Sequence, residues 1–184
     1  ATVPFLPDNE FLAGARPMTT RELFERIFLG SFPGIVQGGS EQRELFYSSY
    51  VQTYLERDIR DLGSVGDLDR FFRFLRSVAA RTAQLLNYAE LSRDADISIA
   101  TAKSWLSILE ASNLVYLLKP YANNLTSRLV KTPKLYLLDT GLAAFLTQWP
   151  TAAVLETGAM SGAFFETWCL AEILKSYYNS GKTR

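Results

Sequence analysis

The sequence contains no histidine and only one cysteine, Cys169, in its 184 residues. Without histidine, the chain can form neither a Ser-His-Asp triad nor a histidine general base. One cysteine cannot form a disulfide within the chain, and it cannot supply the several Cys and His ligands that a zinc site needs. The simplest role for Cys169 is that of a small buried apolar residue.

Long apolar runs and an excess of either charge are also missing. The apolar runs 114–118 and 135–138 are far shorter than the roughly 20 residues that span a bilayer, and no basic-then-apolar signal opens the chain. We therefore expect a cytoplasmic protein without a membrane partner. Lys and Arg total 19, as do Asp and Glu, so binding to nucleic acid would require a local basic patch.

Glycine-rich phosphate loops are absent as well. The sequence has no G-x-x-x-x-G-K-[ST] motif and no G-x-G-x-x-G motif. Residues 180–183 read Ser-Gly-Lys-Thr, but they follow a helical pattern rather than a strand and lack the first glycine. The chain by itself is therefore expected to bind neither ATP nor another cofactor.

Apolar spacing and capping residues predict a mainly helical chain. The predicted helices cover residues 20–29, 41–62, 68–83, 88–94, 99–111, 142–148 and 163–178. Two β-like runs, 114–118 and 135–138, are separated by a polar, basic loop. A helix, a tight turn at 95–97, a second helix and a hairpin form the layout of a winged helix-turn-helix. The predicted fold class is a mainly α helical bundle with a winged helix-turn-helix and a small β-hairpin.

Two of the predicted helices carry apolar stripes that we expect to be buried. In helix 41–62 the stripe consists of Leu45, Phe46, Tyr50, Val51, Tyr54, Leu55, Ile59 and Leu62. In the last helix it consists of Phe164, Phe165, Trp168, Leu170, Ala171, Ile173 and Leu174. Residues that recur every three or four positions share one face of a helix.

The predicted helix 99–111 is the candidate recognition helix. Its apolar side would face the core, and its opposite side carries Lys103, Ser104 and Ser107, together with two alanines. Small polar side chains allow close approach to a DNA groove, but a single cation is little for base or phosphate contacts. A structural helix with a solvated face explains the same pattern, and the weak charge favours that interpretation.

The segment 111–138 contains no acidic residue and is the second candidate for DNA contact. Its cations are Lys119, Arg128, Lys131 and Lys134, and Tyr121 adds an aromatic face. Such a segment could follow DNA phosphates. A solvated hairpin loop, or a basic surface that docks on an acidic partner domain, fits the pattern equally well.

Arg57 and Arg60 lie in a segment of alternating charge, 54–61. The simpler interpretation is a helix surface with i,i+4 ion pairs, each worth a few tenths of a kcal/mol. The more specific interpretation makes one of these arginines a phosphate sensor that faces a nucleotide-binding domain. The sequence alone favours the simpler interpretation.

Glu166 and Glu172 lie on the last predicted helix and are the candidates for a carboxylate metal pair. Six residues along a helix correspond to about 600°, so the two side chains point about 120° apart. A joint metal site is therefore not expected without ligands from elsewhere.

Several segments together resemble one known family. They read YVQTYLERDI at 50–59, LNYAEL at 86–91, TAKSWL at 101–106, LKPY at 118–121, RLVKTPKLY at 128–136, LDTGL at 138–142 and GAFFE at 162–166. The sequence resembles the C-terminal region of predicted prokaryotic AAA+-type P-loop ATPases, which is a domain of unknown function. The resemblance covers residues 32–178 in order.

The resemblance implies a larger protein with three parts. A P-loop ATPase domain, which would bind ATP and Mg²⁺, would precede residue 1, and residues 1–18 would be an irregular connector from it. Residues 19–66 would form a helical, lid-like segment, and residues 67–148 the winged-helix-like domain. Residues 149–184 would be a linker and the first helix of a restriction-endonuclease-like domain. Glu166 would match that domain's first acidic residue, whose catalytic partners would follow residue 184.

The sequence therefore predicts a non-catalytic accessory region of a larger ATPase. The expected partners are the ATPase domain in the same chain and DNA, with Lys103, Ser104, Ser107, Lys119, Arg128, Lys131 and Lys134 as the DNA contacts. Arg57 and Arg60 stay candidates for nucleotide sensing. The alternative is a docking scaffold for the ATPase domain or another protein, which the 13% aromatic content favours. The sequence leaves homo-oligomerisation open.

Overall fold

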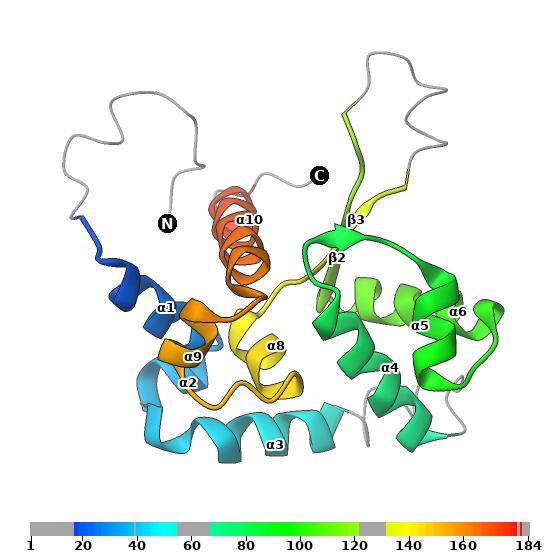
Figure 1. Ribbon diagram of the computed structural model, residues 1–184, viewed down its shortest axis with the longest axis horizontal. Helices are drawn as coiled ribbons and strands as arrows, with labels where there is room; N and C mark the ends of the chain where they lie inside the picture. The colour runs from blue at the N-terminus through cyan, green and yellow to red at the C-terminus, as the bar shows by residue number, and fades with distance from the viewer. Residues whose placement is uncertain (1–16, 39, 55–66, 122–131, 180, 182–184) are drawn as a thin grey trace.

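The computed structural model describes residues 17–38, 40–54, 67–121, 132–179 and 181, and these residues are mainly helical (Figure 1). The helices are α1 (Thr20–Leu29), α2 (Pro33–Gly38), α3 (Arg43–Tyr54), α4 (Leu68–Ala80), α5 (Tyr88–Ala95), α6 (Ile99–Ala111), α8 (Thr140–Leu146), α9 (Ala152–Thr157) and α10 (Ser161–Asn179). A 3₁₀ turn, Ser40–Gln42, leads into α3. The strands are β1 (Gln84–Leu85), β2 (Val115–Leu118) and β3 (Lys134–Leu137).

Helix α8 lies between two groups of helices. In Figure 1, α1, α2 and α9 are to its left, α4, α5 and α6 are to its right, and α3 runs along the bottom. Helix α8 packs against α1 and α3 on one side and α4 on the other. Buried residues from both groups therefore form one continuous core.

Side-chain caps fix the starts of several helices where the sequence predicts them. Thr19 and Glu22 form a reciprocal capping box at α1. Asp67 accepts a hydrogen bond from the Arg70 amide at α4, and Ser98 accepts one from the Thr101 amide at α6. The bounds predicted for the helices 20–29 and 99–111 are confirmed.

The three strands form an antiparallel sheet in the order β1-β3-β2. The predicted hairpin is confirmed, with Val115 opposite Leu137 and Leu118 opposite Lys134. Strand β1 was not predicted, because its two exposed residues show no alternation of apolar and polar side chains. Along the chain the order is α4, β1, α5, α6, β2 and β3.

The predicted apolar stripe of the helix 41–62 is wrong in part. Leu45 is 71% exposed, whereas Tyr47 and Arg43 are almost fully buried. Both buried side chains make polar contacts with the end of α1 and the start of α8, and Val51 of the predicted stripe is buried as well. Residues 55–62, including the remaining stripe positions, lie outside the described part of the chain.

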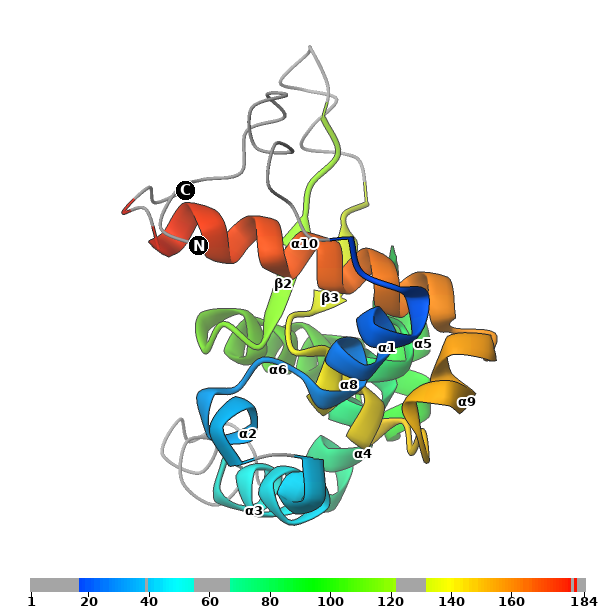
Figure 2. The ribbon, with the colours of Figure 1, turned by 90° about the vertical axis from the view of Figure 1, so that its left-hand side faces the viewer.

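Helix α10 runs across the upper part of the helical body in Figure 2 and packs against α1 and α8. Its buried residues are Phe164, Thr167, Ala171 and Ser176. Phe165 and Ile173, which the predicted stripe included, are 44% and 38% exposed. The predicted stripe contained apolar residues alone, whereas two of the buried residues, Thr167 and Ser176, carry hydroxyl groups. Helix α9 lies in the segment predicted as a linker.

None of the helices among the described residues combines the length and the apolar character needed to cross a bilayer.

Candidate functional site

The junction of α5 and α6 presents a helix on the surface. Helix α5 ends at Ala95, and the left-handed φ of 54° at its C-cap, Asp96, turns the chain sharply toward the α6 cap. On the inner side of α6, Trp105 packs edge-on against Phe71 and Phe74 of α4, with ring centroids 5.1 and 5.6 Å away. This aromatic contact turns the opposite side of α6 toward solvent.

The residues predicted to contact DNA on α6 all lie on that exposed side. They are Lys103, Ser104 and Ser107, and the exposed Ala100 and Ala111 flank them. The Ser107 hydroxyl donates to the Ser104 carbonyl, and the Lys103 ammonium lies 5.5 Å from the centre of the Tyr88 ring. The exposed side of α6 thus consists mainly of small side chains and carries a single cation, Lys103, which makes a cation–π contact with Tyr88.

The cations of the basic segment lie in different surroundings. Lys119 is exposed just after β2. Lys134 instead forms an ion pair of 2.5 Å with Glu166 of α10. Arg128 and Lys131 lie outside the described residues, as do Arg57 and Arg60. Among the residues that the structure describes, the predicted DNA contacts with exposed side chains are therefore Lys119 and the three α6 residues, which lie on different elements.

Glu166 joins α10 to the central strand of the sheet. One carboxylate oxygen accepts hydrogen bonds from Lys134 Nζ and, at 2.6 Å, from Tyr136 Oη. The Lys134 bond, followed by that of Tyr136, lowers the pKa of Glu166 below its ordinary value. Burial, reinforced by the bond to Glu166, raises the pKa of the Tyr136 hydroxyl. Glu166 thus acts as a structural acceptor here.

Carboxylates do not converge into a metal site in this part of the chain. Glu172 lies 2.7 Å from Lys175 on its own helix, away from the Glu166 contact with the sheet. Among the residues that the structure describes, no three Cys, Asp or Glu side chains lie close enough to hold a metal ion together.

A buried polar network around Asp139 joins the end of α1 and helix α3 to the start of α8. One Asp139 oxygen accepts from the Leu142 amide at 2.7 Å and lies 2.9 Å from the Tyr47 hydroxyl. The other accepts from the amide and the hydroxyl of Ser31. Burial, and then the charge of Asp139, raises the pKa of Tyr47, so the hydroxyl stays protonated and can donate.

Arg43 completes this network from α3. Its guanidinium donates to the carbonyls of Phe28 and Gly141, at 2.9 and 3.1 Å, and stacks 3.8 Å from the Phe28 ring centre. Burial lowers the pKa of Arg43, and the charge of Glu44 opposes that shift. Sequence reasoning missed both residues, because Arg43 is charged and Tyr47 lies outside the predicted apolar stripe of helix 41–62. Every acceptor of Asp139 is used, so the network is a structural joint.

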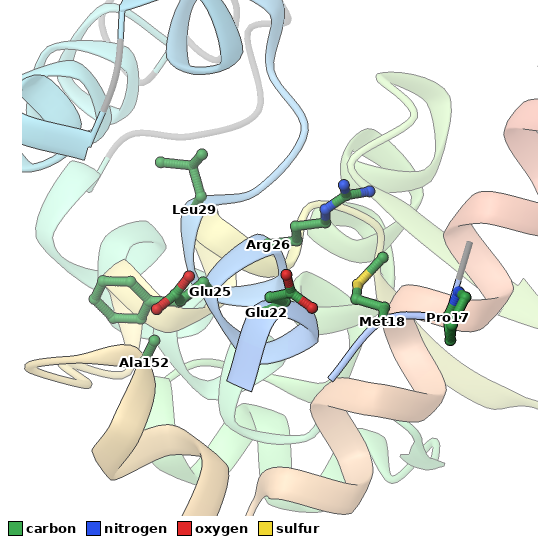
Figure 3. A pocket seen from close by; sticks show the side chains of 8 residues that line it. Pro17, Met18, Glu22, Glu25, Arg26, Leu29 and Ala152 are labelled. Carbon is green, nitrogen blue, oxygen red and sulfur yellow. The ribbon is translucent and has the colours of Figure 1, made fainter. Parts of the chain in front are cut away.

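A cleft of about 750 Å³ lies along α1 beside the start of α9 (Figure 3). Its acidic side chains, Glu22 and Glu25, are already engaged by Thr19 and Arg21 respectively. The other side chains labelled in Figure 3 include Met18, Leu29 and Ala152, which are apolar. The residues that line this cleft therefore do not include a group of free acidic side chains that could act together on a ligand.

Comparisons with known proteins agree on a family without an assigned activity. A family model for a domain of unknown function, DUF8612, matches residues 20–153. Uncharacterized protein Rv2008c of Mycobacterium tuberculosis and uncharacterized protein Mb2031c of Mycobacterium bovis are each 30% identical over 151 residues. The match covers 81% of this chain and 34% of each relative, so the chain spans about a third of their length. No solved structure matches significantly.

The family model extends from α1 into α9 and so includes the α6 face, the three-stranded sheet and the Asp139 network. The chain belongs to the family of proteins that carry this domain of unknown function, DUF8612.

Proposed function

We propose that residues 67–138 form a winged helix-turn-helix that binds duplex DNA through the exposed side of α6. The observation that carries this proposal is the connectivity α4, β1, α5, α6, β2, β3 with the sheet order β1-β3-β2. In a helix-turn-helix the second helix of the pair enters the major groove, and α6 is that helix here. The aromatic packing beneath α6 supports the proposal by leaving Lys103, Ser104 and Ser107 accessible.

The distribution of charge supports the same proposal. Residues 67–138 contain ten Lys and Arg and six Asp and Glu, although the whole chain is neutral. Phosphate contacts supply most of the affinity of proteins for DNA, so this excess of cations favours binding at low salt. The ion pair between Lys134 and Glu166 reduces the excess of positive charge at the base of the hairpin. We therefore expect only a modest affinity for DNA.

In the longer protein, this region would serve an ATPase as a non-catalytic accessory part. The support is the sequence resemblance to AAA+-type proteins, together with relatives about three times as long as the matched region. ATP and Mg²⁺ would bind outside this chain. Nucleotide state in that other part would then modulate the contact of α6 with DNA.

Fluorescence anisotropy with a labelled duplex tests the proposal. We expect binding tighter than millimolar at about 50 mM KCl and about 40-fold weaker binding at about 200 mM, which corresponds to about three phosphate contacts. Lys103→Gln with Lys119→Gln should weaken binding about tenfold or more. Arg128→Ala with Lys131→Ala and Lys134→Ala should weaken it as well.

A matched control removes the same number of charges elsewhere. Arg21→Gln with Lys175→Gln changes one cation on α1 and one on α10, each paired with a glutamate of its own helix. This control should leave the affinity for DNA within about twofold of the wild type. DNA binding by α6 would be refuted if the dissociation constant at low salt is millimolar or weaker. It would also be refuted if the Lys103/Lys119 variant and the Arg21/Lys175 control lose the same affinity for DNA.

One observation favours a second function, a docking scaffold for the rest of the longer protein. Helix α10 exposes Phe165, Ile173 and Tyr178, each by about two-fifths of its surface. A contiguous exposed apolar patch is typical of a protein contact, and we infer that these side chains contribute to one in the longer protein. In a full-length protein, Phe165→Ser with Ile173→Ser would then release the preceding part to proteolysis while leaving DNA binding intact. Unchanged proteolysis of the full-length variant would rule out this function.

A further inference from the structure

A groove of about 480 Å³ separates α4 from the segment that follows α8. Three arginines of α4 and its C-terminal cap line it: Arg73, Arg76 and Arg81. Trp149 and Met160 form part of its other side, and Asp94 is its acidic residue. We call this feature the arginine groove. It lies apart from the α6 residues to which the proposed DNA contact is assigned.

The charge of Arg81 is already balanced. Its guanidinium lies 2.6 Å from Asp94 Oδ2 and 3.2 Å from Glu90 Oε2. The Ser77 hydroxyl donates to the same Asp94 oxygen at 2.8 Å. This cluster is satisfied internally, and it leaves Asp94 unable to neutralise the other two arginines.

Arg73 and Arg76 have no carboxylate partner among the described residues. Arg76 donates from Nε to the Leu146 carbonyl at 3.0 Å, and its guanidinium lies 5.8 Å from the centre of the Phe72 ring. Its two terminal amino groups have no hydrogen-bond acceptor among the described residues. Arg73, one turn earlier on α4, is exposed. Two positive charges therefore border the same groove without compensation.

The indole N–H of Trp149 is a buried donor without an acceptor in the described part of the chain. The far edge of the ring packs on Gly158, where an added Cβ would lie 2.5 Å from Cζ3. The ring is thus held in place and cannot easily turn its N–H toward solvent. A buried, unsatisfied N–H costs about 1–3 kcal/mol, and such groups often mark a missing water or ion.

We propose that the arginine groove binds a phosphate group. The planar guanidinium of arginine matches phosphate oxygens through paired N–H donors, and an oxyanion would also compensate the two free charges. Trp149 lines the same groove, so its indole signal should report on an anion bound there. Inorganic phosphate and the phosphoryl group of a phosphomonoester share this chemistry, and the experiment separates them.

The indole N–H signals of the ¹⁵N-labelled chain test the proposal directly. The protein has three tryptophans, and Trp149→Phe identifies the signal that belongs to Trp149. Phosphate is added in a phosphate-free buffer up to about 10 mM, with KCl at matched ionic strength as the salt control. Adenosine 5′-monophosphate is titrated in parallel as the phosphomonoester.

We expect phosphate, but not KCl, to move the Trp149 signal saturably. Arg73→Gln with Arg76→Gln should raise the dissociation constant at least about tenfold. Arg26→Gln with Arg93→Gln, which removes two exposed arginines outside the groove, should change it by less than about twofold. Arg73→Gln alone alters one exposed side chain, so its weaker binding is measurable even if the double variant fails to fold.

The two ligands then identify the source of the phosphate. Saturable binding of both shows that the groove accepts the phosphoryl group of a larger molecule, and binding of inorganic phosphate alone limits it to the free ion. No saturable shift with either ligand, or the same loss in the Arg26/Arg93 control, overturns the proposal. Neither result depends on whether α6 binds DNA.

Discussion

Replacing Tyr47 with phenylalanine removes one hydroxyl from the buried network around Asp139. Tyr47 is fully buried, and its oxygen lies 2.9 Å from both Asp139 Oδ1 and the Leu29 carbonyl. The ring itself stays, stacked 5.8 Å from Phe145. The substitution therefore tests the polar joint between α3 and α8 with little change in packing.

The expected cost follows from the groups left behind. Asp139 keeps the amide of Leu142 and both donors of Ser31, but the Leu29 carbonyl loses this contact. A hydrogen bond to a charged group contributes about 1.5–3 kcal/mol. For a chain of this length, 1 kcal/mol corresponds to about 2–4 °C, so the melting temperature should fall by about 3–12 °C.

Urea unfolding and thermal melts of Tyr47→Phe measure this loss. The matched control is Tyr178→Phe, which removes the same hydroxyl from a 41% exposed side chain on α10. The free energy of unfolding of this control should be within about 0.5 kcal/mol of that of the wild type. If Tyr47→Phe is no less stable than Tyr178→Phe, the Asp139 network does not hold the helices together.

The pH dependence provides an internal check on the same variant. Burial and the charge of Asp139 raise the pKa of Tyr47 in the folded chain. A group with a raised pKa stabilises the fold below its unfolded pKa, about 10 for tyrosine, and that contribution is lost as pH rises further. The difference in stability between wild type and Tyr47→Phe should therefore narrow above about pH 10.

Two further predictions concern the same joint and the α10 contact. Gly141→Ala would place a Cβ 2.5 Å from the Leu29 carbonyl oxygen, so urea unfolding should show a free energy of unfolding that is about 2 kcal/mol or more lower. Gly162→Ala is the control, because an added Cβ there meets open space, and it should be neutral or slightly stabilising. Glu166→Gln should cost less than about 1 kcal/mol at pH 7, because the Lys134 pair is partly exposed. The lowered pKa of Glu166 stabilises the fold above the unfolded value, about 4.3, and that contribution is lost as pH falls below it. The effect of Glu166→Gln should therefore disappear in acid, and a loss that persists there would contradict the assigned ion pair.

Local signals predicted much of the helical architecture. Thr19, Asp67, Asn87 and Ser98 cap the helices that follow them, because each side chain satisfies backbone amides within three residues. Strand β1 escaped prediction because it exists only through pairing with β3, about 50 residues later. The residues next to β1 in the sequence do not indicate that β3 will pair with it.

Contacts between distant segments explain what the sequence could not predict about the sites. The exposed side of α6 follows from its apolar spacing, so its residues were placed correctly on the surface. The partner of Lys134, by contrast, is 32 residues away on α10. The arginine groove combines α4 with Trp149, and its uncompensated charges become apparent only when the acidic neighbours are seen to be engaged.

Backbone amide shifts of the ¹⁵N-labelled chain, recorded as a DNA duplex is added at low salt, test the central proposal most directly. If α6 is the recognition helix, the largest shifts will occur at Lys103, Ser104 and Ser107, and Lys103→Gln with Lys119→Gln will reduce them. The proposal is contradicted if the duplex shifts no signals, or if the largest shifts lie on α1, α9 or the arginine groove.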